Sequence, residues 1–154
     1  MMHNWFECKV RYEKLMENGV TAKVNEPYLV DALSFTEAEA RIIEEMQPYI
    51  SGEFTVSDIK RAKYSELFTS TLDSDDKWYK CKLLFITLDD KNGKEKKSST
   101  LILVQAGNLR KAVDNLDENM KGTLSDYEIA SVIETAIVDI FPFEADKTTN
   151  SPEE

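Results

Sequence analysis

The sequence has few of the residues on which most catalytic and metal sites are built. Its 154 residues include one histidine (His3), two cysteines (Cys8 and Cys81) and five glycines. One histidine near the N-terminus excludes a Ser/His/Asp or Cys/His arrangement in the body of the chain, and two cysteines are too few for a structural zinc site. Neither a P-loop nor a G-x-G-x-x-G fingerprint occurs. We therefore expect no cofactor, metal ion or catalytic residue, although the abundant carboxylates leave a carboxylate-only hydrolase open.

Long apolar runs are missing as well. No stretch of about 18 apolar residues is present, so we expect no membrane-spanning segment. The opening "MMHNWFECKV" lacks the apolar centre of a signal peptide, which indicates a cytoplasmic protein with reduced thiols. The net charge of −10 disfavours tight binding to duplex DNA, because lysine and arginine must displace its counterions, but a local basic surface remains compatible with it.

The chain does contain an internal repeat. The segment "WFECKV" at 5–10 returns 73 residues later as "WYKCKL", with both tryptophans and both cysteines of the chain in the same register. Two further pairs follow at almost the same spacing: "YLVDA" (28–32) with "ILVQA" (102–106), and "FTVSDIKRAKYSELF" (54–68) with "YEIASVIETAIVDIF" (127–141). The pattern predicts a tandem duplication with repeats at 5–68 and 78–141.

Each repeat is predicted to fold as β-β-α-β. The alternating opening strand leads to an Asn-Gly turn, which suits a tight hairpin. In the first repeat Thr36 is the expected N-cap of the helix, with Glu39 closing a capping box, and in the second Asn108 is the expected cap. The last elements, 54–68 and 127–141, have the β-branched and aromatic content of bent or bulged strands, and a helix at 127–141 stays open as an alternative.

A single such unit would leave a sheet face or edge uncovered, so two units related by a pseudo-twofold are expected to share a core. The fold class that follows is α+β, with a mostly antiparallel sheet built from the two units and one helix per unit. We interpret residues 1–143 as one domain and 144–154 as a flexible acidic tail. The connector "DSDDK" at 73–77 is expected to be a solvated linker.

Strand alternation assigns two faces to the repeated strand. One face is expected to be core, together with part of the second helix: Phe6, Cys8, Val10, Tyr79, Cys81, Leu83, Leu116 and Met120. The other face carries the candidate binding residues Trp5, Lys9, Arg11, Trp78, Lys80 and Lys82, which Lys60, Arg61 and Lys63 of a later strand extend. We expect this second face to be exposed and locally positive.

Aromatic rings beside lysine and arginine are typical of surfaces that bind single-stranded nucleic acid, because bases stack on the rings and cations meet phosphates. A structural interpretation competes with this one. Tryptophan at the start of a strand also covers the end of a core. Lysine on a solvent-exposed strand face protects a sheet edge from pairing with another chain. Protein contact is the third interpretation, since tryptophan and arginine are frequent anchors of interfaces.

The sequence resembles a family of short uncharacterised proteins, classed as a domain of unknown function, from gut bacteria and their phages. The resemblance is carried by "WFECKV", by "YLVDALSFTEAEA" and by "SDYEIASVIETAIVDIFPF", and it covers residues 4–143. It implies an accessory role linked to phages or mobile elements. It implies no activity and assigns no residue a role.

Two hypotheses about function follow, and both describe a binding protein rather than an enzyme. The first is an accessory protein that binds single-stranded nucleic acid through the Trp5 and Trp78 face. The second is a protein–protein interaction adaptor without nucleic-acid binding, which uses the same face or the acidic helix surface of Glu37, Glu44 and Glu45. The sequence does not indicate the oligomeric state.

Overall fold

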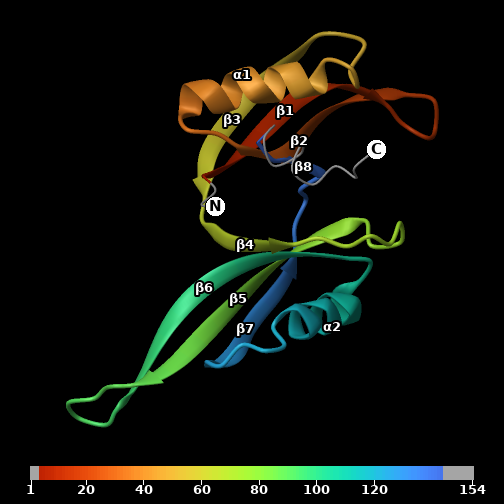
Figure 1. Cartoon of the computed structure of the whole chain (residues 1–154). Coiled ribbons are helices and arrows are strands. Elements are labelled where there is room, and N and C mark those ends of the chain that lie inside the picture. The colour runs from red at the N-terminus through yellow and green to blue at the C-terminus, as the bar shows by residue number, and fades with distance from the viewer. Residues whose placement is uncertain (1–3, 144–154) are drawn as a thin grey trace, which may run out of the picture. The chain divides into compact units, whose positions relative to one another are not determined.

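The computed structural model describes residues 4–143, which separate into two compact units (Figure 1). Residues 4–63 and 137–143 form unit 1, and residues 64–136 form unit 2. The α+β class, the mostly antiparallel pairing and the single helix per unit are confirmed. The strands form two four-stranded sheets rather than one joined sheet. Neither helix is long and apolar enough to cross a membrane.

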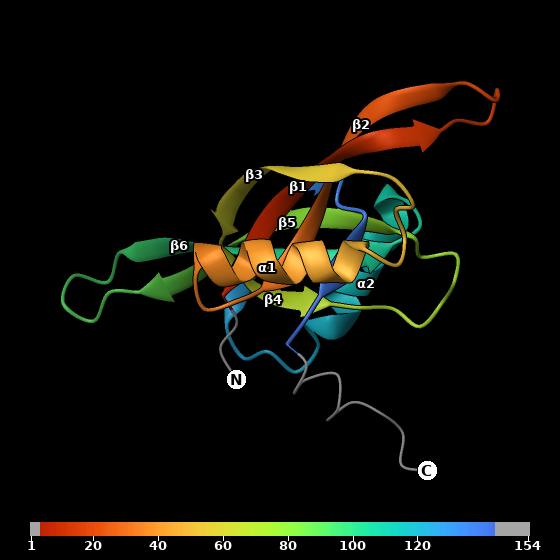
Figure 2. The ribbon, with the colours of Figure 1, turned by 90° about the horizontal axis from the view of Figure 1, so that it is seen from above.

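Unit 1 is a sheet in the order β3-β1-β2-β8 with one helix packed on it. Its elements are β1 (Trp5–Leu15), β2 (Thr21–Asp31), α1 (Phe35–Met46), β3 (Phe54–Ala62) and β8 (Asp139–Phe141). β1 pairs antiparallel with β2 and β3, while β8 is parallel to β2. Gly19 has a φ of +84° in the β1–β2 turn, as the Asn-Gly pair predicts. Beyond the part of the sheet that α1 covers, β1 and β2 continue as a two-stranded ribbon (Figure 2).

Unit 2 repeats this plan with the order β4-β6-β5-β7. Its elements are β4 (Tyr64–Phe68), β5 (Lys77–Leu88), β6 (Glu95–Ala106), α2 (Leu109–Asn119) and β7 (Asp126–Glu134). Antiparallel pairs join β5 to β6 and to β7, and a parallel pair joins β4 to β6. Gly93, with a φ of +69°, makes the β5–β6 turn. Here too the hairpin extends as a ribbon.

The last strand of each repeat joins the sheet that the other repeat forms. Each long strand expected from the sequence divides in two, at Lys63 in the first repeat and at 135–138 in the second. β4 then pairs with β6 of unit 2, and β8 pairs with β2 of unit 1. The helix alternative for 127–141 is therefore wrong.

The two exchanged strands lie in corresponding registers. Phe68 lies opposite Val104 in unit 2, and Phe141 lies opposite Val30 in unit 1. These partners are 73 and 74 residues apart, which agrees with the sequence repeat. The tandem duplication itself and the pseudo-twofold stay predictions, as does the interpretation of 1–143 as one domain. The tail at 144–154 and His3 lie outside the described residues.

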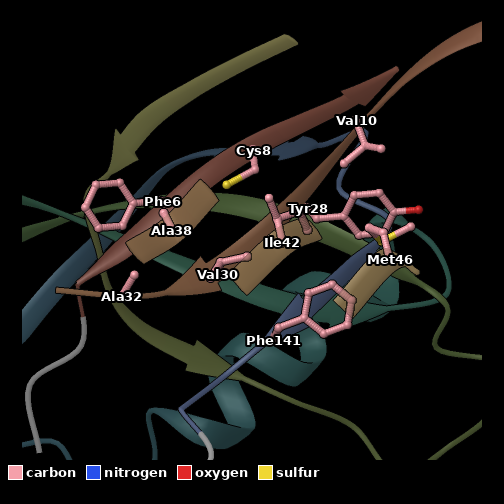
Figure 3. Close-up of a cluster of buried hydrophobic side chains, with 10 residues drawn as sticks. All are labelled: Phe6, Cys8, Val10, Tyr28, Val30, Ala32, Ala38, Ile42, Met46 and Phe141. Atoms are coloured by element: carbon pink, nitrogen blue, oxygen red, sulfur yellow. The ribbon is translucent and has the colours of Figure 1, made fainter. Parts of the chain in front are cut away.

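Each unit has its own apolar core between the helix and one sheet face. In unit 1 the core is made of Phe6, Cys8, Val10, Tyr28, Val30, Ala32, Ala38, Ile42, Met46 and Phe141 (Figure 3). Of these, Phe141 comes from β8, and its ring stacks on Tyr28 with 5.9 Å between ring centroids. All eight residues that the sequence assigned to the core are buried. The alternation of the repeated strand therefore predicted the core face correctly.

The helix caps differ in one place from the prediction. Ser34, not Thr36, is the N-cap of α1: its Oγ accepts from the Glu37 N–H at 3.1 Å, and the Glu37 carboxylate accepts from the Leu33 N–H. This places the capping pair two residues earlier than expected, because "SFTE" has the same Ser/Thr-x-x-Glu spacing as "TEAE". Asn108 caps α2 as predicted, with its Oδ1 accepting from the Lys111 N–H at 2.8 Å.

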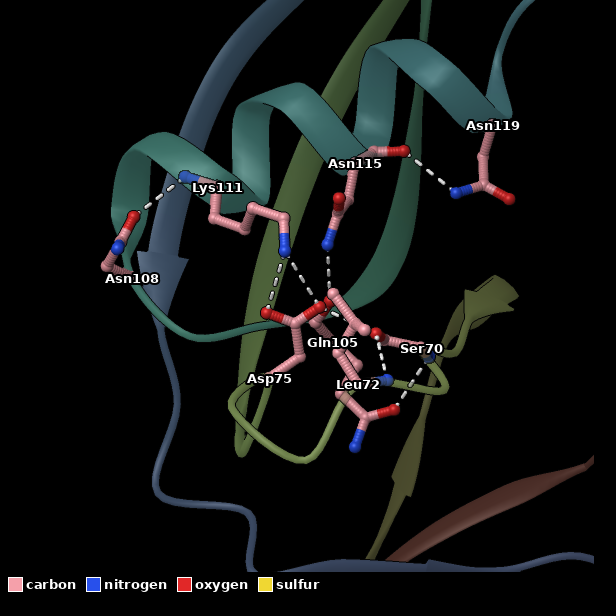
Figure 4. Close-up of polar contacts among 8 residues, drawn as sticks. All are labelled: Ser70, Leu72, Asp75, Gln105, Asn108, Lys111, Asn115 and Asn119. Atoms are coloured by element: carbon pink, nitrogen blue, oxygen red, sulfur yellow. Dashed lines mark hydrogen bonds and ion pairs between the residues drawn. The ribbon is translucent and has the colours of Figure 1, made fainter.

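In the connector between the repeats, Asp73, Ser74, Asp76 and Lys77 are exposed as expected of a solvated linker, but Asp75 is bound to the rest of unit 2 (Figure 4). Asp75 is 3% exposed. Its carboxylate accepts from Ser70 Oγ at 2.6 Å and from Lys111 Nζ of α2 at 3.1 and 3.2 Å. A Cβ on Gly107 would lie 2.5 Å from the Ser74 carbonyl oxygen, so only glycine allows this approach of the connector.

These contacts make stability depend on pH. The hydrogen bond from Ser70, together with Lys111, holds the pKa of Asp75 below its ordinary value of 3.8 despite burial. A group whose pKa falls on folding stabilises the fold above its unfolded pKa, and this contribution is lost as the pH falls through the folded pKa. Below about pH 4, the free energy of unfolding should therefore fall more steeply for the wild type than for Asp75→Asn.

Chemical denaturation at a series of acidic pH values measures this difference. Asp73→Asn, an exposed position in the same connector, is the matched control and should keep the wild-type slope. Equal slopes for the wild type and Asp75→Asn would show that the carboxylate contributes nothing to stability.

Candidate functional site

The two tryptophans of the predicted binding face are buried. Trp5 and Trp78 are each 5% exposed, so the expectation that both rings lie on an open surface is wrong. They do point away from the core face, as alternation predicts. This second face also carries fully buried apolar residues, Leu29 near Trp5 and Leu103 near Trp78. Neither ring is available for a base to stack on.

The basic residues of that prediction are mostly exposed, but they do not form one sheet surface. Lys9, which is partly buried, and Arg11 lie on β1 of unit 1, whereas Lys80 and Lys82 lie on β5 of unit 2. Being on different sheets, they cannot extend one another as a single strand face. The predicted positive surface is therefore divided between the units.

The three basic residues that follow in the first repeat also separate. Lys60 lies beside β1 with its Nζ 4.0 Å from the Glu7 carboxylate. Arg61 turns to the helix-covered face, where its guanidinium lies 5.0 Å from the ring centroid of Phe6 and 5.4 Å from that of Phe35. Lys63 is exposed at the break between β3 and β4. Successive residues of a strand alternate between faces, so Lys60 and Arg61 cannot contact the same ligand surface.

The cysteines are packed thiols, as the alternation indicates. Both are buried and unpaired. Burial is the main cause that raises the pKa of Cys8 to about 12 and that of Cys81 to about 11, so neither thiol is a nucleophile near neutral pH. In residues 4–143 no three His, Cys, Asp or Glu side chains are placed to hold a metal ion.

A shallow groove in unit 1 is a concave feature that the sequence did not single out. It runs between α1 and β3 and has a volume of about 530 Å³. The helix side consists of Glu39, Ile43 and Gln47, which lie on successive turns, and the strand side is formed by residues 52–56. Ile43 is 37% exposed and lies outside the buried stripe of α1. The groove lining thus combines apolar side chains with two carboxylates, Glu39 and Glu53.

The strand side of the groove is an open sheet edge. β3 is the end strand of its sheet, and no other strand of residues 4–143 pairs with its outer side. The first residues of β3, Phe54–Val56, are uncharged. A bulge then interrupts the pairing with β1 opposite Lys9 and Val10, and the charged residues Asp58, Lys60 and Arg61 follow. Bulges and charges protect an edge against pairing, so the accessible edge is short and lies at 53–56.

Unit 2 closes the corresponding place with a polar contact. Tyr127 occupies the register position in β7 that Phe54 occupies in β3, opposite Phe85 and Tyr12 respectively. Its hydroxyl donates to Asp117 Oδ1 of α2 at 3.2 Å, and Asp117 lies 74 residues after Ile43. In unit 1 the two positions are apolar and make no such bond. The two units therefore differ in the side chains and the hydrogen bonding at this place.

A second cavity adjoins the groove at the base of the β1–β2 ribbon. Its volume is about 680 Å³, and it shares residues 52–55 with the groove. Arg11, Glu13 and Lys23 line its ribbon side. Near this side Tyr12 donates to Glu26 Oε1 at 2.7 Å and Lys14 to Glu26 Oε2 at 3.0 Å, which fixes the two ribbon strands to each other. Together the two cavities surround the beginning of β3.

A known family model, described as a domain of unknown function (DUF4494), matches residues 4–143. The chain belongs to the DUF4494 family. No curated protein and no solved structure matches the chain. The DUF4494 match spans residues of both units and includes β4 and β8.

For this DUF4494 chain, the groove residues could have been suspected from one signal in the sequence. The apolar stripe of α1 runs through Ala38, Ile42 and Met46, and Ile43 lies beside it on the polar side. An isoleucine outside the stripe, in a helix whose counterpart carries aspartate at that position, distinguishes the first repeat from the second. The open edge of β3 could not be predicted from such a local signal, because it depends on which strands pair in the sheet.

Proposed function

We propose that the protein is a protein–protein interaction adaptor that binds an extended segment of a partner as an added strand on β3. The observation that carries the proposal is the groove between α1 and the open edge at 53–56. An exposed strand edge beside a helix can accept a peptide through main-chain hydrogen bonds, while side-chain pockets along it give specificity. A role linked to phages or mobile elements remains part of this proposal.

The groove meets the physical requirements of such a site. Backbone N–H and C=O groups on an outer strand edge are unsatisfied by the protein, so an added strand gains hydrogen bonds without breaking any within the sheet. Alternate side chains of the added strand would face α1, where Ile43 offers an apolar contact. The bulge after Val56 limits the added strand to a few residues.

The nucleic-acid hypothesis is the weaker of the two. Its stacking platform requires exposed rings, and both tryptophans are buried. Its phosphate contacts require clustered cations, and within unit 1 Lys60 and Arg61 lie on opposite faces of β3. Binding of single-stranded nucleic acid thus has no support from the placement of these residues, and the experiment below tests it alongside the adaptor proposal.

The chain itself suggests a variant that closes the groove. Ile43→Asp with Phe54→Tyr installs in unit 1 the polar bridge that Asp117 and Tyr127 make in unit 2. Peptides selected from a random displayed library on the wild-type protein should bind this double variant about tenfold more weakly or worse, since it loses the apolar contact and fills the groove. Fluorescence polarisation with labelled selected peptides measures the change.

The control is Ile133→Asp, an equally polar change at an exposed isoleucine of β7 in unit 2. It should leave peptide binding unchanged. Equal peptide binding by the wild type and the double variant would place the site elsewhere. If selection yields no peptide while a labelled single-stranded oligonucleotide binds at low salt and is released at high salt, the nucleic-acid hypothesis replaces the adaptor proposal.

A further inference from the structure

The β5–β6 ribbon of unit 2 carries a second open strand edge, and this one has a small net positive charge. β4 pairs with β6 only at residues 101–104. The outer side of β6 at residues 95–99 therefore has no partner strand in the described part of the chain. The ribbon extends beyond α2 (Figure 1). Residues 89–99 contain four lysines, Lys91, Lys94, Lys96 and Lys97, and three carboxylates, Asp89, Asp90 and Glu95.

This edge and the groove in unit 1 are complementary in charge and in hydrogen-bonding character. The groove presents Glu39 and Glu53 beside the open edge of β3, and both glutamates are exposed, as are residues 95–99 of β6. Lysines on an edge oppose its pairing with an identical edge, because like charges would meet. Opposite two carboxylates the same lysines favour pairing. Lys96 and Lys97 therefore favour the pairing of β6 with β3, beside which Glu39 and Glu53 lie.

Extending the proposed function, we infer that the groove between α1 and β3 binds the β6 edge at residues 95–99 of a second copy of this chain. Lys96 and Lys97 point to opposite faces of the strand. In either orientation of the added strand, either Lys96 or Lys97 therefore points toward α1, on which Glu39 lies. Lys97 contacts the exposed Glu128 at 3.5 Å within its own unit, and an exposed pair of this kind is easily exchanged for another.

The contact that results joins two different surfaces of the chain. One copy contributes its ribbon and the second contributes its groove, so after one contact the first copy retains a free groove and the second a free ribbon. These two surfaces can bind each other in a closed two-copy complex, or they can bind further copies. The association should therefore increase with protein concentration and weaken with salt, which screens exposed charges.

The test uses two variants that each disable one half of the contact. Ile43→Asp with Phe54→Tyr closes the groove and keeps the ribbon, while Lys96→Glu with Lys97→Glu reverses the ribbon charge and keeps the groove. Light scattering after size exclusion should show that each variant alone is monomeric where the wild type associates. Mixed in equal amounts, the two should form a complex of two chains that does not grow, because only one intact contact remains.

Lys80→Glu with Lys82→Glu is the matched control, since it makes the same charge change on the exposed residues of β5 in the same unit. It should associate as the wild type does, whereas the Lys96 and Lys97 variant should associate about tenfold more weakly or worse. Circular dichroism of each variant checks that the fold is retained. Adding Glu39→Lys and Glu53→Lys to the ribbon variant should restore association by exchanging the two charges.

Three results would overturn the inference: a wild-type mass that does not change with concentration, association of the groove-closed variant equal to that of the wild type, or a mixture that stays monomeric. If library peptides bind the groove while the wild type shows no self-association, the adaptor proposal stands and the second copy is not its partner. If neither peptides nor a second copy bind, both proposals fail.

Discussion

Replacing Leu116 by alanine is expected to lower the free energy of unfolding by about 2–5 kcal/mol. Leu116 is fully buried where α2 packs against β5 and β6 in unit 2. The substitution removes the transfer free energy of its methyl groups and leaves a cavity. Rigid strand neighbours such as Leu83 and Val104 cannot fill that cavity without breaking their own packing.

Chemical denaturation measures the effect as a shift of the midpoint at constant slope. Leu109→Ala in the first turn of the same helix is the matched control. Leu109 is 53% exposed, so its substitution should change the free energy of unfolding by less than about 0.5 kcal/mol. A midpoint that Leu116→Ala leaves unchanged would show that another face of α2 is turned to the core.

Replacing Phe141 by alanine is expected to lower the free energy of unfolding by about 3–5 kcal/mol. The destabilisation should affect unit 1, although Phe141 lies near the C-terminal end of the described chain. Phe141 is 7% exposed and belongs to the core that β1, β2 and α1 build. Arg41 fixes the residues that follow: its Nη2 donates to the Pro142 carbonyl oxygen at 2.8 Å, and its guanidinium lies 5.6 Å from the ring centroid of Phe143. Loss of the Phe141 ring should therefore weaken the packing of the whole of β8 on unit 1.

Hydrogen exchange resolves where the loss occurs. In Phe141→Ala the amides of β1 and β2 should exchange faster, while those of β5 and β6 keep their protection. The reciprocal change is Phe68→Ala in β4, which packs against the core of unit 2 and should reverse the pattern. Faster exchange in unit 2 rather than unit 1 after the Phe141 substitution would contradict the exchanged pairing of the last strands.

Much of the fold follows from local sequence signals. Alternation in "WFECKV" and "WYKCKL" correctly predicted which side chains enter the core, and the Asn-Gly pairs predicted both hairpins. These signals depend only on neighbouring residues and on backbone preferences. The exchange of β4 and β8 could not be predicted in this way. A single residue, Lys63, separates β3 from β4, so the local pattern continues across the break while the pairing partner changes.

The error about the tryptophans has a different origin. Alternation placed Trp5 and Trp78 correctly on the face opposite the core, but that face was assumed to be exposed to solvent. The segments "YLVDA" and "ILVQA" carried the opposite signal, because Leu29 and Val30 are adjacent, and Leu103 and Val104 likewise. Consecutive apolar residues in a strand indicate that both faces are covered. Both pairs are indeed fully buried.

The exchanged strands also set an order in which the chain can fold as it is synthesised. Unit 2 is continuous in sequence, so all four of its strands exist once residue 136 has left the ribosome. Unit 1 begins the chain, yet its sheet stays incomplete until Phe141 emerges, because β8 must cover the outer edge of β2. Domains usually mature from the N-terminus onward, and contacts between distant segments form slowly. In this protein unit 2 can therefore complete its sheet first. The β2 edge of unit 1 stays unpaired until β8 has been synthesised.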